Sequence, residues 1–292
     1  RHTGRGMRGS FEGVFYKSAP APQNVNDMPA IYVFYKEVFI MSDIITERTV
    51  ITSRGIPVIT AQPSSPGPWP LALINHGTGG DAEGMKEMAV RLAENGCFAL
   101  SIDGVWHGRR WDEQLDIMCH SDRYKELYLT MLLEMAADMT AIIDFYEADP
   151  RVDTHRVGIT GTSQGGYVAF MTMTKEPRIT AAAPMIGSPD LTDRYGKSAP
   201  WEEIDPATQA RVLEHNPLAH YETMAHVKLL VQNGNADDCV PVTGVQRLDE
   251  KLKPLFASHP EDYRYIEYPG LGHATPDEMQ ERVIAWLTQA LS

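Results

Sequence analysis

The sequence predicts an α/β fold, with a mostly parallel central sheet flanked by helices and a cap inserted above it. Short apolar runs of strand type alternate with helical patterns, which favours parallel strands covered on both faces. The chain has 292 residues, of which 43% are hydrophobic and 22% charged. These are ordinary values for a globular protein. A glycine-flanked serine in the stretch GTSQG, residues 161–165, lies between one such strand and a helix.

The charge of the chain argues against two classes of partner. Its formal net charge is −13, whereas nucleic acids and anionic membrane surfaces require clustered Lys and Arg. No apolar run approaches the roughly 20 residues of a membrane-spanning helix. We therefore expect a small-molecule partner, no nucleic acid and no membrane, and the sequence leaves a homo-oligomer open.

The three cysteines, Cys97, Cys119 and Cys239, are sparse and odd in number. They lack the paired spacing of a disulfide framework or a zinc site. The apolar stretch at residues 31–41 has neither the charged start nor the small-residue cleavage site of a signal peptide. The sequence therefore predicts a reducing, cytoplasmic location and no metal site.

Residues 1–40 differ from the rest of the chain. They carry five Lys or Arg and three Asp or Glu, whereas the chain as a whole is strongly acidic. They show no helical period and contain several Pro and Gly. We interpret residues 1–40 as an N-terminal extension, native or not, and residues 41–292 as the main domain. An arm that packs on the body or on a second subunit is the alternative, favoured by Tyr32, Phe34, Tyr35 and Phe39.

The elements expected after this extension alternate in type. Two β-branched runs around Arg54-Gly55 predict a hairpin. Apolar runs bounded by turn residues predict strands, and apolar residues three and four apart predict helices. The expected strands cover residues 69–75, 97–103, 156–160, 180–187, 227–233 and 263–269, and the expected helices cover 81–96, 124–150, 165–173, 242–256 and 275–292.

Two features of these helices can be checked in detail. In the long helix at 124–150, five apolar side chains share one face, and we interpret its methionines as core; the face consists of Leu127, Met131, Met135, Met139 and Ile142. At the helix starts, Asp81 is the expected N-cap of the first helix. Thr275 and Glu278 form an expected capping box around Pro276 in the last.

One segment interrupts the alternation. Residues 187–225 contain no expected strand and are rich in Pro, Asp and Trp. At about 39 residues the segment far exceeds the usual connection between a strand and the next element. We interpret it as a cap or lid above the sheet.

Reactive residues follow several of the expected strands. In an open parallel sheet, active sites form beyond the carboxyl ends of the strands. Ser163 follows one strand, Asp237 and Asp238 follow another, and His273 follows a third. Their order along the chain, serine, acid, histidine, is that of the α/β-hydrolases.

The segments that carry this order resemble an α/β-hydrolase over residues 41–292. They are HGTGG (76–80), SIDGVWHGRR (101–110), GTSQGG (161–166), NGNADDCVP (233–241) and GLGH (270–273). The chain is most similar to small esterases of the dienelactone hydrolase and prolyl-oligopeptidase type. The resemblance implies a serine hydrolase that needs no cofactor and no metal.

The expected catalytic residues have distinct chemical roles. Ser163 is the nucleophile, and because a hydroxyl is a poor nucleophile at neutral pH, His273 serves as its base. A carboxylate holds the imidazole in the correct tautomer. Family resemblance points to Asp237, three residues after a strand-end glycine and four before a proline. Asp238 and Asp190 stay open as alternatives.

The tetrahedral intermediate needs preorganised donors of hydrogen bonds. One is expected to be the backbone N–H of Gln164, directly after the nucleophile. Family resemblance places the other at the backbone N–H of Thr78. His76 is expected to shape this loop by local hydrogen bonds.

Residues of the substrate pocket are less well defined by the sequence. Trp106 and His107 follow a strand end, and a similar segment lines the pocket of related esterases. A loop pinned by ion pairs between Asp103 and arginines is an equal alternative. Tyr167, beside Ser163, either contacts the acyl group or packs in the core.

The expected function is a serine carboxylesterase that cleaves small to medium acyl or aryl esters through an acyl-enzyme. A peptidase, a thioesterase or a carbon–carbon hydrolase would use the same three residues. A hydrolase fold reused for ligand binding is a third reading, since fold alone does not determine function.

Overall fold

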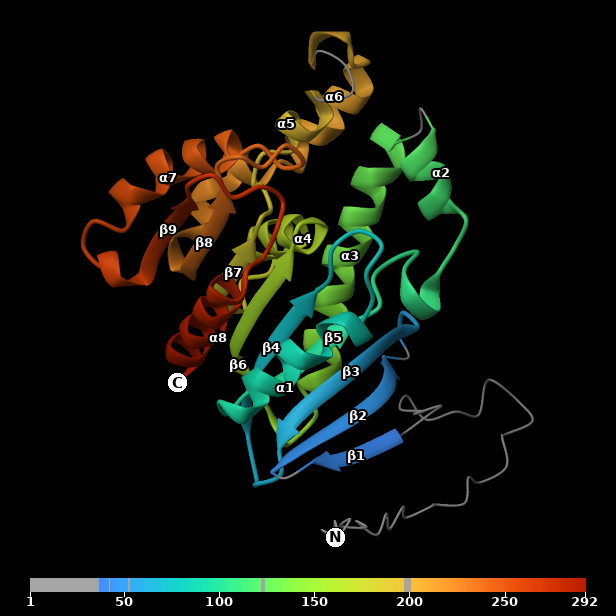
Figure 1. Ribbon diagram of the computed structural model, residues 1–292, viewed down its shortest axis with the longest axis vertical. Helices are drawn as coiled ribbons and strands as arrows, with labels where there is room; N and C mark the ends of the chain where they lie inside the picture. The colour runs from blue at the N-terminus through green and yellow to red at the C-terminus, as the bar shows by residue number, and fades with distance from the viewer. Residues whose placement is uncertain (1–36, 42, 52, 122–123, 197–200) are drawn as a thin grey trace, which may run out of the picture. The chain divides into compact units, whose positions relative to one another are not determined.

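The computed structural model describes residues 37–292, except 42, 52, 122–123 and 197–200. Within these residues a single sheet of nine strands has the order β1-β2-β3-β5-β4-β6-β7-β8-β9 (Figure 1). No helix in this part of the chain is long and apolar enough to cross a membrane. The strands are β1 (Glu37–Met41), β2 (Ile44–Ile51), β3 (Ile56–Pro63), β4 (Trp69–Asn75), β5 (Phe98–Ile102), β6 (Val152–Thr162), β7 (Ile179–Met185), β8 (Lys228–Gly234) and β9 (Tyr263–Tyr268).

The first strands of the sheet are antiparallel. β2 and β3 form the predicted hairpin, with Gly55 at φ 64° in the left-handed region that the turn requires. β1 pairs with β2 from residue 37 on, so the sheet begins before Met41. Phe39 lies in β1, while Tyr32, Phe34 and Tyr35, with most of the expected extension, lie outside the described residues.

The remaining strands are parallel, as the alternating pattern predicts. β5, β4, β6, β7, β8 and β9 pair with one another in parallel, and β5 joins them to the first strands through an antiparallel pairing with β3. Their apolar runs fit this arrangement, because strands covered on both faces must be apolar on both sides. β5, for example, is buried at every position. Parallel pairing brings the carboxyl ends of these strands to one edge of the sheet.

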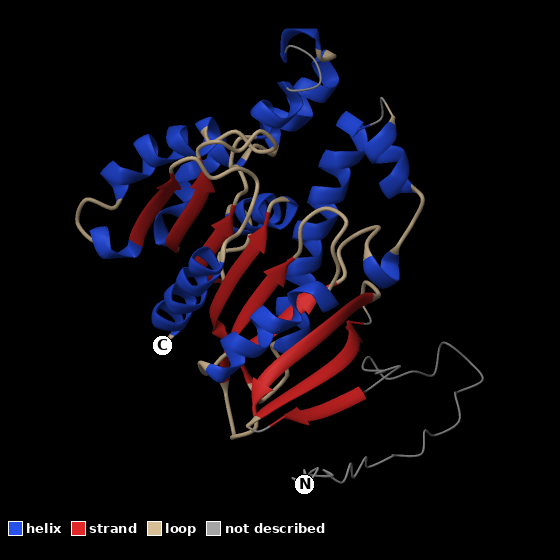
Figure 2. Ribbon diagram, viewed as in Figure 1, coloured by secondary structure: helices blue, strands red, loops and turns tan. Residues whose placement is uncertain are grey.

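Helices cover both faces of the sheet (Figure 2). One core cluster combines side chains of α3, α4 and α7, and the other combines side chains of α1 and α8. The predicted apolar face of α3, including Met131, Met135 and Met139, is buried, so these methionines are core residues. The helices are α1 (Lys86–Glu94), α2 (Gln114–His120), α3 (Tyr124–Tyr146), α4 (Gln164–Met173), α5 (Leu191–Gly196), α6 (Pro206–Glu214), α7 (Thr243–Leu255) and α8 (Asp277–Leu291).

Both expected N-caps differ from the structure. Asp81 Oδ1 accepts the N–H of Gly84 at 2.8 Å, within the 3₁₀ turn that precedes α1, and the N-cap of α1 itself is Met85. The capping box of the last helix was a wrong prediction, because Pro276 has an extended ψ of 160° and α8 starts one residue later. Glu278 forms an ion pair with Arg282 on the next turn.

The described residues of the segment 187–225 contain helical turns and no strand, as expected of a cap. They form α5, α6 and two 3₁₀ segments, Trp201–Glu203 and Pro217–His226. In Figure 1, α5 and α6 lie on the side of the sheet where β6 and β7 end. That this segment covers a site at these strand ends stays a prediction.

Candidate active site

Ser163 occupies a sharp turn between β6 and α4. Its backbone has φ 56° and ψ −112°, a conformation that side-chain-bearing residues rarely adopt. The turn packs so tightly that a Cβ on Gly161 would lie 2.4 Å from the carbonyl oxygen of Gly165. A Cβ on Gly165 would lie 2.3 Å from the carbonyl oxygen of Asn75. The glycines on either side of the serine are therefore steric requirements of this turn.

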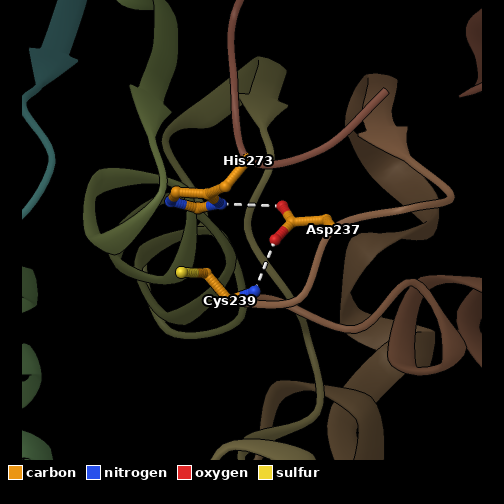
Figure 3. Close-up of side chains that lie close together, drawn as sticks. All are labelled: Asp237, Cys239 and His273. Carbon is orange, nitrogen blue, oxygen red and sulfur yellow. Dashed lines mark hydrogen bonds and ion pairs between the residues drawn. The ribbon is translucent and has the colours of Figure 1, made fainter. Parts of the chain in front are cut away.

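The imidazole of His273 lies between Ser163 and Asp237. His273 Nε2 is 2.9 Å from Ser163 Oγ, and His273 Nδ1 is 2.7 Å from Asp237 Oδ2. Ser163 follows β6, Asp237 follows β8 and His273 follows β9, so the strand ends bring all three side chains to one edge. Figure 3 shows the contact between His273 and Asp237. The Asp237 side chain is fully buried, whereas 28% of the His273 side chain is exposed.

The loop after β8 determines which carboxylate faces the histidine. Asp237 Oδ1 accepts the backbone N–H groups of Cys239 and Val240, both at 2.8 Å. These bonds leave Oδ2 to face His273. The alternative acid Asp238 is exposed, and Asp190 bonds to Asn216 and Arg247 instead.

The two expected oxyanion donors lie on segments that pack against the nucleophile. Gln164 is the first residue of α4, and the first N–H groups of a helix have no partner within the helix. The loop that carries Thr78 touches the same turn, because a Cβ on Gly77 would be 3.5 Å from the Cβ of Ser163. Both main-chain segments are therefore close to the Ser163 hydroxyl.

A side-chain hydrogen bond joins these two segments, which sequence reasoning missed. The hydroxyl of Thr78 donates to Gln164 Oε1 at 2.7 Å, and the amide of Gln164 donates to Met135 Sδ at 3.3 Å. Gln164 is only 1% exposed. The amide side chain of Gln164 thus ties the oxyanion loop to α3 and α4. Only the polar residue types at 78 and 164 hinted at this contact.

Comparison with known proteins adds the family. The profile of the prolyl oligopeptidase family matches residues 123–292, more than half of the chain. The chain belongs to this family. The matched residues include the serine, the acid and the histidine described above.

Individual relatives of this family member are distant. "Putative esterase YitV" of Bacillus subtilis is 22% identical over 231 residues, covering 74% of this chain and 88% of that protein. "Putative carboxymethylenebutenolidase" of Methylorubrum extorquens is 25% identical, covering 75% of this chain and 67% of that protein. The crystal structure of TT1662 from Thermus thermophilus superposes with a TM-score of 0.67 at 23% identity, covering 88% and 99% of the two chains. This likeness confirms the predicted α/β-hydrolase fold.

His76 holds the loop that carries Thr78 by local hydrogen bonds, as expected. His76 Nδ1 donates to the carbonyl oxygen of Gly77 at 2.7 Å, and His76 Nε2 accepts the N–H of Gly104 at 3.0 Å. Burial lowers the pKa of His76 from the ordinary 6.5 to about 4, against the opposing effect of the Gly77 hydrogen bond. The imidazole is therefore neutral at pH 7, which its acceptor role requires.

The expected pocket residues differ in accessibility. His107 is 1% exposed, its Nδ1 lies 2.7 Å from the carbonyl oxygen of Val105, and burial lowers its pKa. Tyr167 is also 1% exposed and packs edge-on against Tyr128. Trp106 is partly exposed and has φ 64°. Trp106 is thus the most accessible of the three expected substrate contacts.

The loop after β5 is pinned, but not by the expected ion pairs of Asp103. The carboxylate of Asp103 accepts the backbone N–H groups of Ala82 and Arg109. The guanidinium of Arg110 instead pairs with Asp138 of α3, a fully buried carboxylate. The loop that holds Trp106 is therefore anchored to the segment before α1, through Ala82, and to α3, through Asp138.

The low pKa of His76 predicts a pH dependence of stability. Between pH 6.5 and about 4 the unfolded chain binds a proton at this residue and the folded chain does not. Stability from this residue is therefore complete above pH 6.5 and declines as the pH falls, by roughly 3 kcal/mol over the window. We expect the difference in unfolding free energy between wild type and His76→Asn to shrink from pH 7 to pH 4.

Urea unfolding at several pH values measures this difference, and effects of other titrating groups cancel between the two proteins. Parallel stability curves for wild type and His76→Asn would show that His76 does not titrate with a lowered pKa.

Proposed function

We propose that this protein is a serine carboxylesterase that cleaves small to medium acyl or aryl esters through an acyl-enzyme. The observation that carries the proposal is the continuous hydrogen-bonded chain from Ser163 Oγ through the His273 imidazole to Asp237. A loop serine without catalytic function has no need of this chain, nor of the strained backbone at Ser163.

In the first half of the reaction, Ser163 Oγ attacks the ester carbonyl carbon while its proton passes to His273 Nε2. The imidazolium that forms is stabilised by the buried carboxylate of Asp237. The carbonyl oxygen becomes an oxyanion, to which the backbone N–H groups of Gln164 and Thr78 donate in this mechanism. Collapse of the intermediate releases the alcohol, which takes the proton from His273.

In the second half, water replaces the alcohol. His273 removes a proton from water, the hydroxide attacks the acyl carbon, and a second oxyanion forms in the same place. Its collapse breaks the bond to Ser163 Oγ, which regains a proton from His273. These steps use groups of the chain and water alone.

The relatives support an ester as the bond cleaved. The relative from Bacillus subtilis carries the name of an esterase, and the one from Methylorubrum extorquens that of a carboxymethylenebutenolidase. The same three residues would also cleave an amide, a thioester or a carbon–carbon bond. Matched ester, thioester and amide substrates with one acyl group decide between these activities. We expect the ester to have the highest kcat/KM.

A cytoplasmic location remains part of the proposal. It rests on the three cysteines, Cys97, Cys119 and Cys239, none of which forms a disulfide in the described part of the chain, as a reducing compartment would favour.

Replacement of the nucleophile tests the proposal directly. Ser163→Ala removes the attacking oxygen, and we expect kcat for p-nitrophenyl acetate to fall by at least about four orders of magnitude. A fluorophosphonate probe should label wild type and not the variant. Ser258→Ala, at an exposed serine, is the control and should keep full activity. Unchanged turnover by folded Ser163→Ala would refute the mechanism.

The bond between Thr78 and Gln164 predicts a smaller effect. Thr78→Val removes the hydroxyl but keeps the backbone N–H and the side-chain shape. We expect kcat to fall about fivefold with little change in KM, since one such hydrogen bond contributes about 1 kcal/mol to positioning. Thr78→Ser keeps the hydroxyl and should restore most of the rate. If Thr78→Val and Thr78→Ser behave alike, the hydroxyl does not position the oxyanion donors.

A further inference from the structure

Cys239 lies beside the catalytic residues, although the proposed reaction does not use it. Its thiol is free and exposed. One ligand atom each from Asp237, Cys239 and His273 lies within 4.8 Å of the other two. Figure 3 shows the sulfur of Cys239 turned to the same side as the His273 imidazole. The three side chains thus offer sulfur, nitrogen and oxygen donors around one point.

The position of the thiol follows from the way the acid is held. The backbone N–H of Cys239 donates to Asp237 Oδ1 at 2.8 Å, so the chain turns back on itself after the acid. The hydrogen bond that orients the carboxylate toward His273 therefore also fixes Cys239 next to both.

This set of donors suits one class of ion. Zn²⁺ binds thiolate sulfur at about 2.3 Å and imidazole nitrogen or carboxylate oxygen at about 2.0–2.2 Å. Tetrahedral coordination at these lengths puts the donors roughly 3.2–3.6 Å apart. The present donor atoms lie within 4.8 Å of one another. Side-chain rotations that move each atom by roughly 1 Å would bring them to the separations that Zn²⁺ requires. Hard ions such as Mg²⁺ and Ca²⁺ prefer all-oxygen sites.

We propose that Asp237, Cys239 and His273 form an inhibitory Zn²⁺ site at the edge of the active centre. Zn²⁺ binds the deprotonated thiol, whose proton is released to solvent, one ring nitrogen of His273 and one oxygen of Asp237, with water as fourth ligand. If the metal takes Nε2, His273 loses the lone pair that accepts the serine proton. If it takes Nδ1, the bond to Asp237 is broken. Either coordination stops acylation.

The inhibitory effect rests on the proposed esterase function, whereas metal binding does not. The experiment therefore has two separate readouts. The first is inhibition of p-nitrophenyl acetate hydrolysis by ZnCl₂ in buffer free of chelators and thiols, relative to the metal-free rate of each variant. The second is the thiolate-to-metal absorption band that appears when CoCl₂ is added, recorded on the Ser163→Ala variant, which needs no activity.

Two cysteine variants separate this site from unspecific metal effects. In Cys239→Ser we expect the half-inhibitory Zn²⁺ concentration to rise about a hundredfold or more, since even an outer partner of a metal ligand is worth about 10- to 100-fold. The Co²⁺ absorption band should disappear when the same change is made in the Ser163→Ala background. Cys119→Ser, at the other exposed cysteine, should change neither readout. A chelator should restore activity in wild type.

Two outcomes would overturn the site. One is equal Zn²⁺ inhibition of wild type and Cys239→Ser, which leaves the esterase function standing. The other is a Co²⁺ band that survives in Cys239→Ser with Ser163→Ala. Conversely, a band that depends on Cys239 in a protein without ester hydrolysis would support the metal site and refute the proposed function.

Discussion

The double hydrogen bond of one imidazole is the interaction on which the site depends. Ser163 and His273 are 110 positions apart in the chain, and Asp237 and His273 are 36 apart, yet their side chains meet at 2.9 and 2.7 Å. Only the sheet can bring them together, because β6, β8 and β9 run parallel and end at the same edge. Parallel pairing of the sheet is thus a precondition of the chemistry.

The scaffold sustains local strain at this edge. A positive φ at a residue other than glycine costs about 1–3 kcal/mol and persists only where the surroundings over-determine it. Every residue of α4 is buried, and the N–H of Ser163 donates to the carbonyl oxygen of Met185. The turn is held from the helix on one side and from β7 on the other. This rigidity keeps the hydroxyl pointing toward His273.

The expected oxyanion donors are backbone N–H groups, so their orientation depends on the loop or helix that carries them. Side chains around these segments must therefore hold them in place. Neutral His76 holds the oxyanion loop through Gly77 and Gly104, and the bond of Thr78 to Gln164 links that loop to α4. The burial that keeps His76 neutral therefore helps to fix the position of the expected oxyanion donor at Thr78. The proposed donors owe their geometry to side chains that never touch the substrate.

Much of this architecture could be predicted from the sequence. Parallel strands and α3 follow from apolar periodicity. The order of the serine, the acid and the histidine follows from their places after predicted strands and from the resemblance to α/β-hydrolases. Tertiary details could not be predicted, because they depend on which polar groups meet after folding. Arg110 forms an ion pair with Asp138 of α3, and Thr78 donates a hydrogen bond to Gln164 of α4. The extended backbone of Pro276 makes α8 begin one residue later than predicted. The proximity of Cys239 to His273 belongs to the same class.

The most direct test of the central claim compares two adjacent carboxylates in the loop after β8. Asp237→Asn replaces the acceptor of the His273 Nδ1 proton by an amide of the same shape, whereas Asp238→Asn changes an exposed neighbour. Measured as kcat/KM for p-nitrophenyl acetate, the first change should lower activity by about 10³–10⁴ and the second by less than about tenfold. Equal losses in the two variants, or a larger loss in Asp238→Asn, would contradict the account.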